Sequence, residues 1–359
     1  MTDTGTDTGT STGTSTGGTD TTGILDEALE RLHTSGPERL GRLTNHAPMA
    51  VEALTARGRP EAVHKWLDLY ARKLEEFPAR VAPVTDADWH TALGDPRRAA
   101  DWIAYFHRQL DERPWREVLA QWWPRLLPGM YGGSTHPVIR VGHAVRTLEA
   151  GEASGVTAPR LAELAHGLGY WAARHRPLTD VTPLPGARSA ADALDAVPPL
   201  ADRTDGGFPA RLGRVRGLPV WAASVDGPEE ARRRLTELVR AATHRYATHG
   251  HGDETMLVHA ATAPNAVLRA LPALPRALWV PSLHAAWTAS AAVTAMYAPD
   301  TPVACDPPGT FTAQEVFERA LAHGDEHVIK LTDTALDVGD ERALAAALRA
   351  VELSEPLAP

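Results

Sequence analysis

The chain has 359 residues, 43% of them hydrophobic, enough for one large domain or two ordinary ones. Its single cysteine, Cys305, excludes an internal disulfide and a zinc or iron–sulfur site built from cysteines. The net charge of −9, without a basic cluster, argues against nucleic acid as a partner. Histidine is frequent, at 16 residues, so any metal site must be built from histidines and carboxylates.

The first 23 residues repeat threonine, glycine, serine and aspartate with almost no apolar side chain. Such a segment cannot bury enough apolar surface to offset its chain entropy, so residues 1–23 are expected to be disordered. The segment also lacks the basic region and apolar run of a secretory signal. We therefore expect a cytoplasmic protein whose folded part covers residues 24–359.

The folded part has a helical pattern almost throughout. Apolar residues recur at i, i+3, i+4 and i+7, the spacing of one helix face. Six segments have this spacing: 24–33, 60–77, 95–110, 115–127, 158–175 and 228–246. Strand-like alternation is nearly absent, and residues 218–224 are the best candidate for a strand. The pattern predicts an all-α fold, a single large multi-helix domain.

One irregular insert interrupts this pattern. Between about residues 177 and 217 the sequence is rich in proline, glycine and aspartate, with one short helical piece near Ala190. A long irregular insert inside a compact domain is often a lid or a binding loop. A spacer between two helical halves would have the same composition, so both interpretations stay open.

Residues 277–298 carry no formal charge, and the segment is long enough to span a bilayer. It is mostly alanine rather than leucine, and it contains Pro281 and several polar residues. We therefore expect a helix buried at the centre of the protein and not a membrane span. His284 in this helix is a candidate catalytic or substrate-contacting residue.

Several histidines stand at the starts of predicted helices. His46 precedes Pro48 in the motif NHAPM, where a helix start would place the ring at the mouth of a cavity. His136 stands just before the proline that begins another helix. Arg140 and His143 follow on the same stripe of that otherwise apolar helix, and polar groups are costly to bury there unless they bind something. A satisfied internal network is the alternative for this stripe.

Two further histidine segments are predicted to be buried. His259 is embedded among apolar residues, as a core residue or as a ligand. The segment HGDEHVIK reads as part of one long helix, in which His323, His327 and Lys330 share a face. A buried lysine is costly as a cation. A neutral lysine amine can add carbon dioxide and become a carbamate, an anionic oxygen ligand for a hard or borderline metal.

Taken together, the motifs NHAPM, GGSTHPVIRVGHAVR, HAATAP and HGDEHVIKLTDTAL resemble the questin oxidase-like family, in this order and over most of residues 24–340. The resemblance implies oxidative ring opening of an anthraquinone-type aromatic in polyketide biosynthesis, either Baeyer–Villiger-like or dioxygenative. One branch of the family looks like a non-haem iron dioxygenase with several histidines and a carboxylated lysine as ligands.

Applied to this chain, the resemblance implies Fe(II), with dioxygen as co-substrate. The implied ligands are His46, His136, His143, His259, His327 and a carboxylated Lys330. This is one histidine more than a four-histidine site needs, and His143 fits least well because it would stand about 10 Å along the helix from His136. His323 is the reserve ligand. Arg140 would hold a phenolate or carboxylate, and tryptophans such as Trp122, Trp123 and Trp287 would line a slot for a flat substrate or pack the core.

Other functions stay open at this point. Ring opening could be cofactor-independent or could use NADPH, although no glycine-rich dinucleotide motif follows a strand. A metal-dependent hydrolase would need aspartates among the histidines, and only Asp325 and Asp333 lie near. A non-catalytic helical binding protein would use the histidines structurally. The expected partner is a small polycyclic aromatic molecule, and a homodimer is left open.

Overall fold

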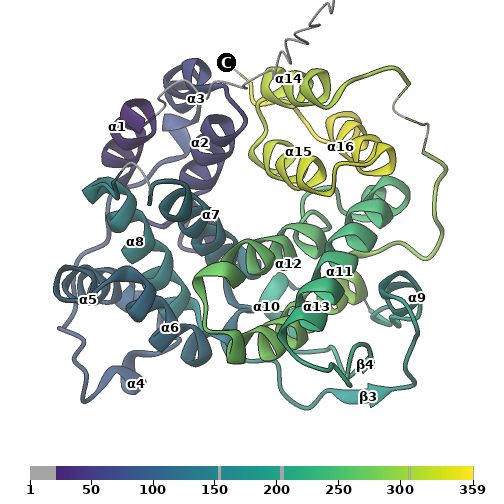
Figure 1. Cartoon of the computed structure of the whole chain (residues 1–359), viewed down its shortest axis with the longest axis horizontal. Coiled ribbons are helices and arrows are strands. Elements are labelled where there is room, and N and C mark those ends of the chain that lie inside the picture. The colour runs from purple at the N-terminus through teal and green to yellow at the C-terminus, as the bar shows by residue number, and fades with distance from the viewer. Residues whose placement is uncertain (1–21, 153–154, 203–205, 306, 308, 359) are drawn as a thin grey trace, which may run out of the picture.

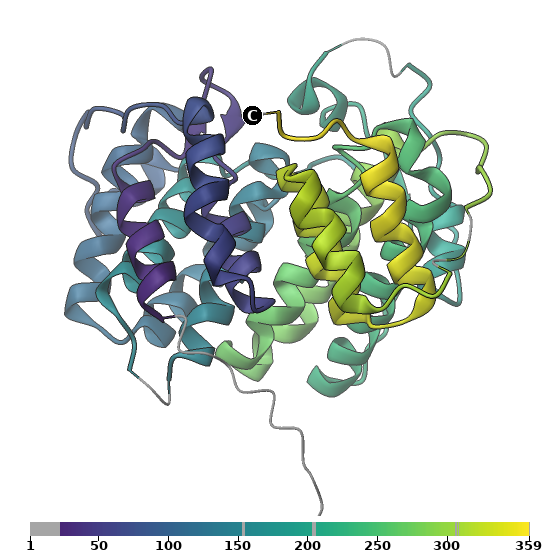
Figure 2. The same cartoon turned by 90° about the horizontal axis from the view of Figure 1, so that it is seen from above.

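The structure is a computed structural model that describes residues 22–152, 155–202, 206–305, 307 and 309–358. These residues form sixteen α-helices and two small two-stranded sheets, which confirms the predicted all-α fold (Figures 1 and 2). Of the segment predicted to be disordered, 1–23, residues 1–21 lie outside the described part of the chain. The first helix begins at Thr22, two residues before the predicted start of the folded part.

The helices up to the insert are α1 (Thr22–His33), α2 (Ala47–Ala56), α3 (Val63–Tyr70), α4 (Trp89–Ala92), α5 (Ala99–Glu112), α6 (Trp115–Leu126), α7 (His136–Ala150) and α8 (Ala158–Arg174). The insert and the C-terminal part contain α9 (Ala190–Asp195), α10 (Phe208–Leu212), α11 (Pro228–His249), α12 (His259–Ala270), α13 (Trp279–Tyr297), α14 (Ala313–His323), α15 (Glu326–Val338) and α16 (Glu341–Leu353). Each of the six segments with helical periodicity contains a helix. The N-terminal helices and the C-terminal helices lie on opposite sides of the molecule in both views (Figures 1 and 2).

The two sides meet where α2 and α7 pack against α12 and α15. The tightest approach is between α7 and α12, at Gly142. A Cβ atom at this position would lie 2.6 Å from the Cβ of Ala266 and 2.7 Å from its Cα, so only glycine lets the two helix backbones come so close.

Gly142→Ala is therefore expected to push α7 and α12 apart and to lower the free energy of unfolding by about 1–3 kcal/mol. Gly213→Ala is the matched control, because the nearest atoms to a Cβ there are at an ordinary 3.5 Å. Urea denaturation of both variants measures the difference. Equal stability of Gly142→Ala and the wild type would contradict the expectation.

The segment HGDEHVIK is not one helix, contrary to the prediction. α14 ends at His323, and Gly324 follows in a left-handed conformation with a φ of 78°. Asp325 then caps α15 by accepting hydrogen bonds from two backbone N–H groups of its first turn. His323 therefore belongs to a different helix from His327 and Lys330 and does not share their face.

The uncharged segment 277–298 forms α13, whose residues are mostly buried, as predicted. Its serines are hydrogen-bonded inside the protein: Ser282 accepts from the indole N–H of Trp123 at 2.9 Å, and Ser290 donates to the carbonyl of Ala260 at 2.7 Å. Within the described part of the chain, no helix has the length and apolar character that crossing a membrane requires.

The irregular insert returns to the place where it leaves the helical core. β3 (Thr182–Leu184) pairs in parallel with β4 (Gly217–Pro219), which joins the two ends of the insert. The predicted helical piece near Ala190 is α9, whereas α10 was not predicted. A second small sheet, β1 (Glu38–Arg39) with β2 (Leu43–Thr44), precedes α2. The two ends of the insert therefore lie side by side in the folded chain.

Candidate metal centre

Four histidines from four helices meet where α2, α7, α12 and α15 begin. His46 is the N-cap residue of α2, His136 and His259 are the first residues of α7 and α12, and His327 is the second residue of α15. The ring centroids are 4.4 Å apart for His46 and His136, 4.5 Å for His46 and His327, and 4.2 Å for His136 and His259. The fold thus brings together four of the histidines that the sequence singled out.

The ring nitrogens of this cluster converge. Nε2 of His46 and Nε2 of His136 are 2.7 Å apart, and with His327 they form a buried triad whose ligand atoms lie within 4.8 Å of one another. Nδ1 of His136 lies 2.8 Å from the backbone carbonyl of Gly133, which can only accept. Nδ1 therefore carries the proton, and Nε2 presents its lone pair to the centre. Such a triad could hold a metal ion.

The cluster contains buried nitrogens without a partner. Among the described residues, both ring nitrogens of His259, Nε2 of His327 and Nζ of Lys330 make no hydrogen bond. His259 is 0% exposed and Lys330 is 1% exposed. Because buried polar atoms are almost always partnered, these orphaned nitrogens fit a site whose missing partner is a metal ion.

Burial also sets the protonation states. Desolvation lowers the pKa of all four histidines well below its usual value, and the nearby Lys330 ammonium lowers it further. Desolvation lowers the pKa of Lys330 to about 7, against the opposing effect of Glu326 and Asp325. Metal binding requires neutral imidazoles, so the protein holds the histidines in the form that a ligand needs.

The charge around the centre favours an anion. Each of the four helix N-termini contributes roughly half a positive charge, so a metal cation there needs a negative ligand. Glu326 lies 3.7 Å from Nδ1 of His46, but it is paired with Lys73 at 2.9 Å, and Asp325 caps α15. The nearby carboxylates are thus already engaged. A carbamate on Lys330 would supply the missing negative charge.

The turn before His136 is strained. Gly133, Ser134 and Thr135 have φ values of 56°, 54° and 64°, in the left-handed region that only glycine adopts without cost. Such strain persists where the surroundings impose it, often at functional sites. Here the turn places the Gly133 carbonyl against the ring of His136.

His143 and Arg140 lie outside the cluster, which corrects their predicted roles as ligand and substrate anchor. Nδ1 of His143 donates to Glu52 at 2.5 Å. Arg140 makes a buried two-point ion pair with Glu163, at 2.6 and 2.7 Å. Of the stripe formed by residues 136, 140 and 143, only the first faces the centre. Arg140 and His143 instead belong to internal hydrogen-bond networks, the alternative considered for this stripe.

The remaining candidates also lie elsewhere. His323 bonds to a backbone carbonyl at 3.0 Å and ends α14, a different helix from the one that carries His327. His284 bonds to another backbone carbonyl at 3.0 Å and lines a groove together with Trp287. Trp122 and Trp123 have no exposed surface and pack in the core, so they do not line a slot.

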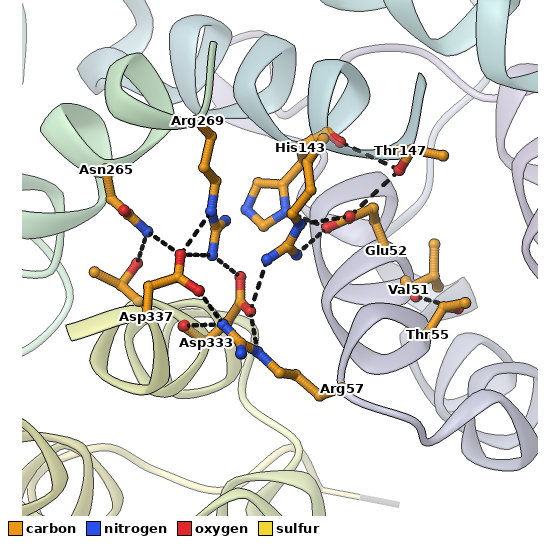
Figure 3. Close-up of polar contacts among 12 residues, drawn as sticks. Val51, Glu52, Thr55, Arg57, His143, Thr147, Asn265, Arg269, Asp333 and Asp337 are labelled. Carbon is orange, nitrogen blue, oxygen red and sulfur yellow. Dashed lines mark hydrogen bonds and ion pairs between the residues drawn. The ribbon is translucent and has the colours of Figure 1, made fainter. Parts of the chain in front are cut away.

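An ion-pair network joins the same four helices further along their axes (Figure 3). At its centre, the carboxylate of Asp333 on α15 accepts from Arg57 at 2.6 Å, Arg146 at 3.0 Å and Arg269 at 2.7 Å. Arg146 of α7 also pairs with Glu52 of α2. The network thus fixes α2, α7, α12 and α15 relative to one another, and with them the histidines at the helix starts. Nothing local in the sequence predicted it.

Comparison with known proteins agrees with the motifs. The family model described as Questin oxidase-like matches residues 43–334, a span that contains the four clustered histidines and Lys330. A comparison with curated proteins gave no match. The chain therefore belongs to the questin oxidase-like family, and this membership points to an oxygenase of polyketide-type metabolism.

Proposed function

We propose that this protein is an oxygenase that opens a ring of an anthraquinone-type polycyclic aromatic at a non-haem iron. The ligands would be His46, His136, His259, His327 and a carboxylated Lys330. The observation that carries the proposal is the buried cluster of four histidines, three of which form a triad that could hold a metal ion. The buried Lys330 is an electrostatic neighbour of all four, and several nitrogens of this set have no partner in the described residues. Iron bound there would supply the activation of dioxygen.

The environment of Lys330 supports its carboxylation. The neutral amine attacks carbon dioxide, a nitrogen–carbon bond forms, and one proton leaves, so that the side chain changes from neutral to singly negative. A pKa of about 7 leaves much of the amine neutral near neutral pH. Without the modification, an ammonium would stand among four helix N-termini and repel a metal ion.

The proposed centre is nearly closed to solvent. His46 and His136 are each 6% exposed and His327 is 7% exposed, whereas His259 and Lys330 are at 0% and 1%. All five residues are thus nearly cut off from solvent, His259 and Lys330 most completely. A closed site of this kind excludes bulk water from the reacting atoms.

The ligand orientations are set by the chain itself. The Gly133 carbonyl accepts from His136, and the hydroxyl of Tyr70 accepts from the backbone N–H of His46 at 3.0 Å. The first contact orients the ring of His136, and the second fixes the backbone at His46, before any substrate binds. A metal-dependent hydrolase has less support, because Asp325 and Asp333 are both committed to other partners.

A single-turnover reaction with ¹⁸O-labelled dioxygen tests the function. The iron-loaded protein, mixed with an anthraquinone-type substrate, is expected to give a ring-opened product that carries at least one labelled oxygen atom by mass spectrometry. His259→Ala is the control and should give no product. A product that takes its new oxygen only from water would indicate hydrolysis and sink the proposal.

A further inference from the structure

A groove beside α13 remains without a role in the chemistry so far. Its volume is about 460 Å³, within the range of pockets that hold small organic ligands. Trp287 and Thr288 of α13 line it, together with Val181, which precedes β3, and Trp221, which follows β4. Figure 1 shows β3 and β4 of the insert close to α13. The segments around β3 and β4 thus line part of the groove.

The lining has the chemistry of a site for a flat, uncharged ligand. The described residues around the groove include no aspartate, glutamate, lysine or arginine, which disfavours acidic ligands, nucleotides and charged peptides. Aromatic rings are prominent: Tyr131, Trp221 and Trp287 face the groove, and the two indole rings are 5.5 Å apart. Aromatic faces and edges pack favourably against a planar aromatic ligand.

One polar group of the groove has no partner. Trp221 is 3% exposed, and its indole N–H makes no hydrogen bond to any part of the protein that the structure describes. By contrast, the indole N–H of Trp287 donates to the carbonyl of Pro219 at 3.0 Å. Buried indole N–H groups usually have an acceptor, and of the two groove tryptophans only Trp221 lacks one among the described residues.

We propose that this groove binds a neutral, planar polycyclic aromatic, with a carbonyl oxygen of the ligand accepting a hydrogen bond from Trp221. That this ligand is the substrate rests on the proposed oxygenase function. Two elements connect the groove with the metal centre. Tyr131 directly precedes the strained turn that leads to His136, and Ser290 of α13 donates to a carbonyl in the first turn of α12.

Acridone binding tests the groove directly. Acridone is a neutral three-ring aromatic with one carbonyl acceptor, has no chelating oxygen pair, and reports binding by its own fluorescence anisotropy. Ala223 is exposed and lines the groove, so Ala223→Trp should fill it and weaken binding at least about tenfold without disturbing the core. Trp221→Phe keeps a ring but removes the N–H, and should weaken binding about fivefold.

Ala196→Trp is the matched control, because Ala196 is exposed on the insert but lies outside the groove lining. It is expected to bind acridone as the wild type does. The proposal is overturned if the wild type does not bind acridone or if Ala223→Trp binds it equally well. If Ala223→Trp incorporates ¹⁸O into the product as the wild type does, the groove is not the substrate site, and the oxygenase function stands. If acridone binds in the groove but no ¹⁸O enters the product, the oxygenase function is wrong, and the groove remains a binding site for a planar aromatic.

Discussion

Lys330→Ala is expected to lower the iron content of freshly purified protein from near one ion per chain to less than about a tenth of that. The variant removes the only proposed anionic ligand from a centre that faces four helix N-termini, and loss of one ligand typically costs at least 10–100-fold in metal affinity. The fold should survive, because Nζ of Lys330 has no hydrogen-bond partner in the described chain that would be left unsatisfied. Elemental analysis by mass spectrometry measures the iron.

Chemical rescue separates ligation from packing in this experiment. Acetate or propionate can enter the space left by the lysine and supply a carboxylate, so either ion should restore iron binding to Lys330→Ala. Lys330→Met is the matched control, since it fills the same space without an amine and leaves no room for rescue. In the wild type, ¹³C-labelled carbon dioxide should give a carbamate signal by NMR. An equal iron content in the wild type and both variants would mean that Lys330 packs the core and does not bind the metal.

Much of the fold and part of the site were accessible from the sequence. Helix periodicity depends on local spacing, so segments such as 95–110 and 158–175 were placed correctly as α5 and α8. His46 and His136 were found because a proline or a capping residue beside each marks a helix start, and helix starts converge in this fold. The lysine was noticed because an ammonium is out of place among apolar residues.

The failures come from contacts between distant segments. A stripe on one helix cannot tell whether His143 faces the metal or Glu52, which is 91 residues away in the chain. Gly324 was passed over because a single glycine can also lie inside a helix, yet here it reverses the chain and separates His323 from His327. The partners of Asp333 could not be predicted either, because they are three arginines from three distant parts of the sequence.

Asp333→Asn is expected to lower the free energy of unfolding by about 3–5 kcal/mol and to weaken iron binding without touching a ligand. The carboxylate is fully buried and accepts from three half-buried arginines, so the nearly isosteric amide removes the negative charge that these arginines share. Asp337→Asn is the control; its side chain is 31% exposed, and a smaller loss is expected. Urea denaturation gives the stabilities, and titration with Fe(II) under anaerobic conditions gives the affinities.

The same network makes the protein sensitive to acid. Burial alone would raise the pKa of Glu52, but Arg146 and His143 outweigh burial and lower this pKa to about 2. Burial would likewise raise the pKa of Asp333, but Arg146, Arg269 and Arg57 hold it well below its usual range. Both carboxylates bind protons more weakly in the folded chain than in the unfolded chain, so their stabilisation is complete above pH of about 4.5 and is lost as the pH falls toward 2. Asp333→Asn removes one of the two titrations, and its stability should therefore fall less steeply between these pH values than that of the wild type. Equal slopes would mean that Asp333 does not carry its charge in the folded protein, and the network would then position the four helices by hydrogen bonds alone.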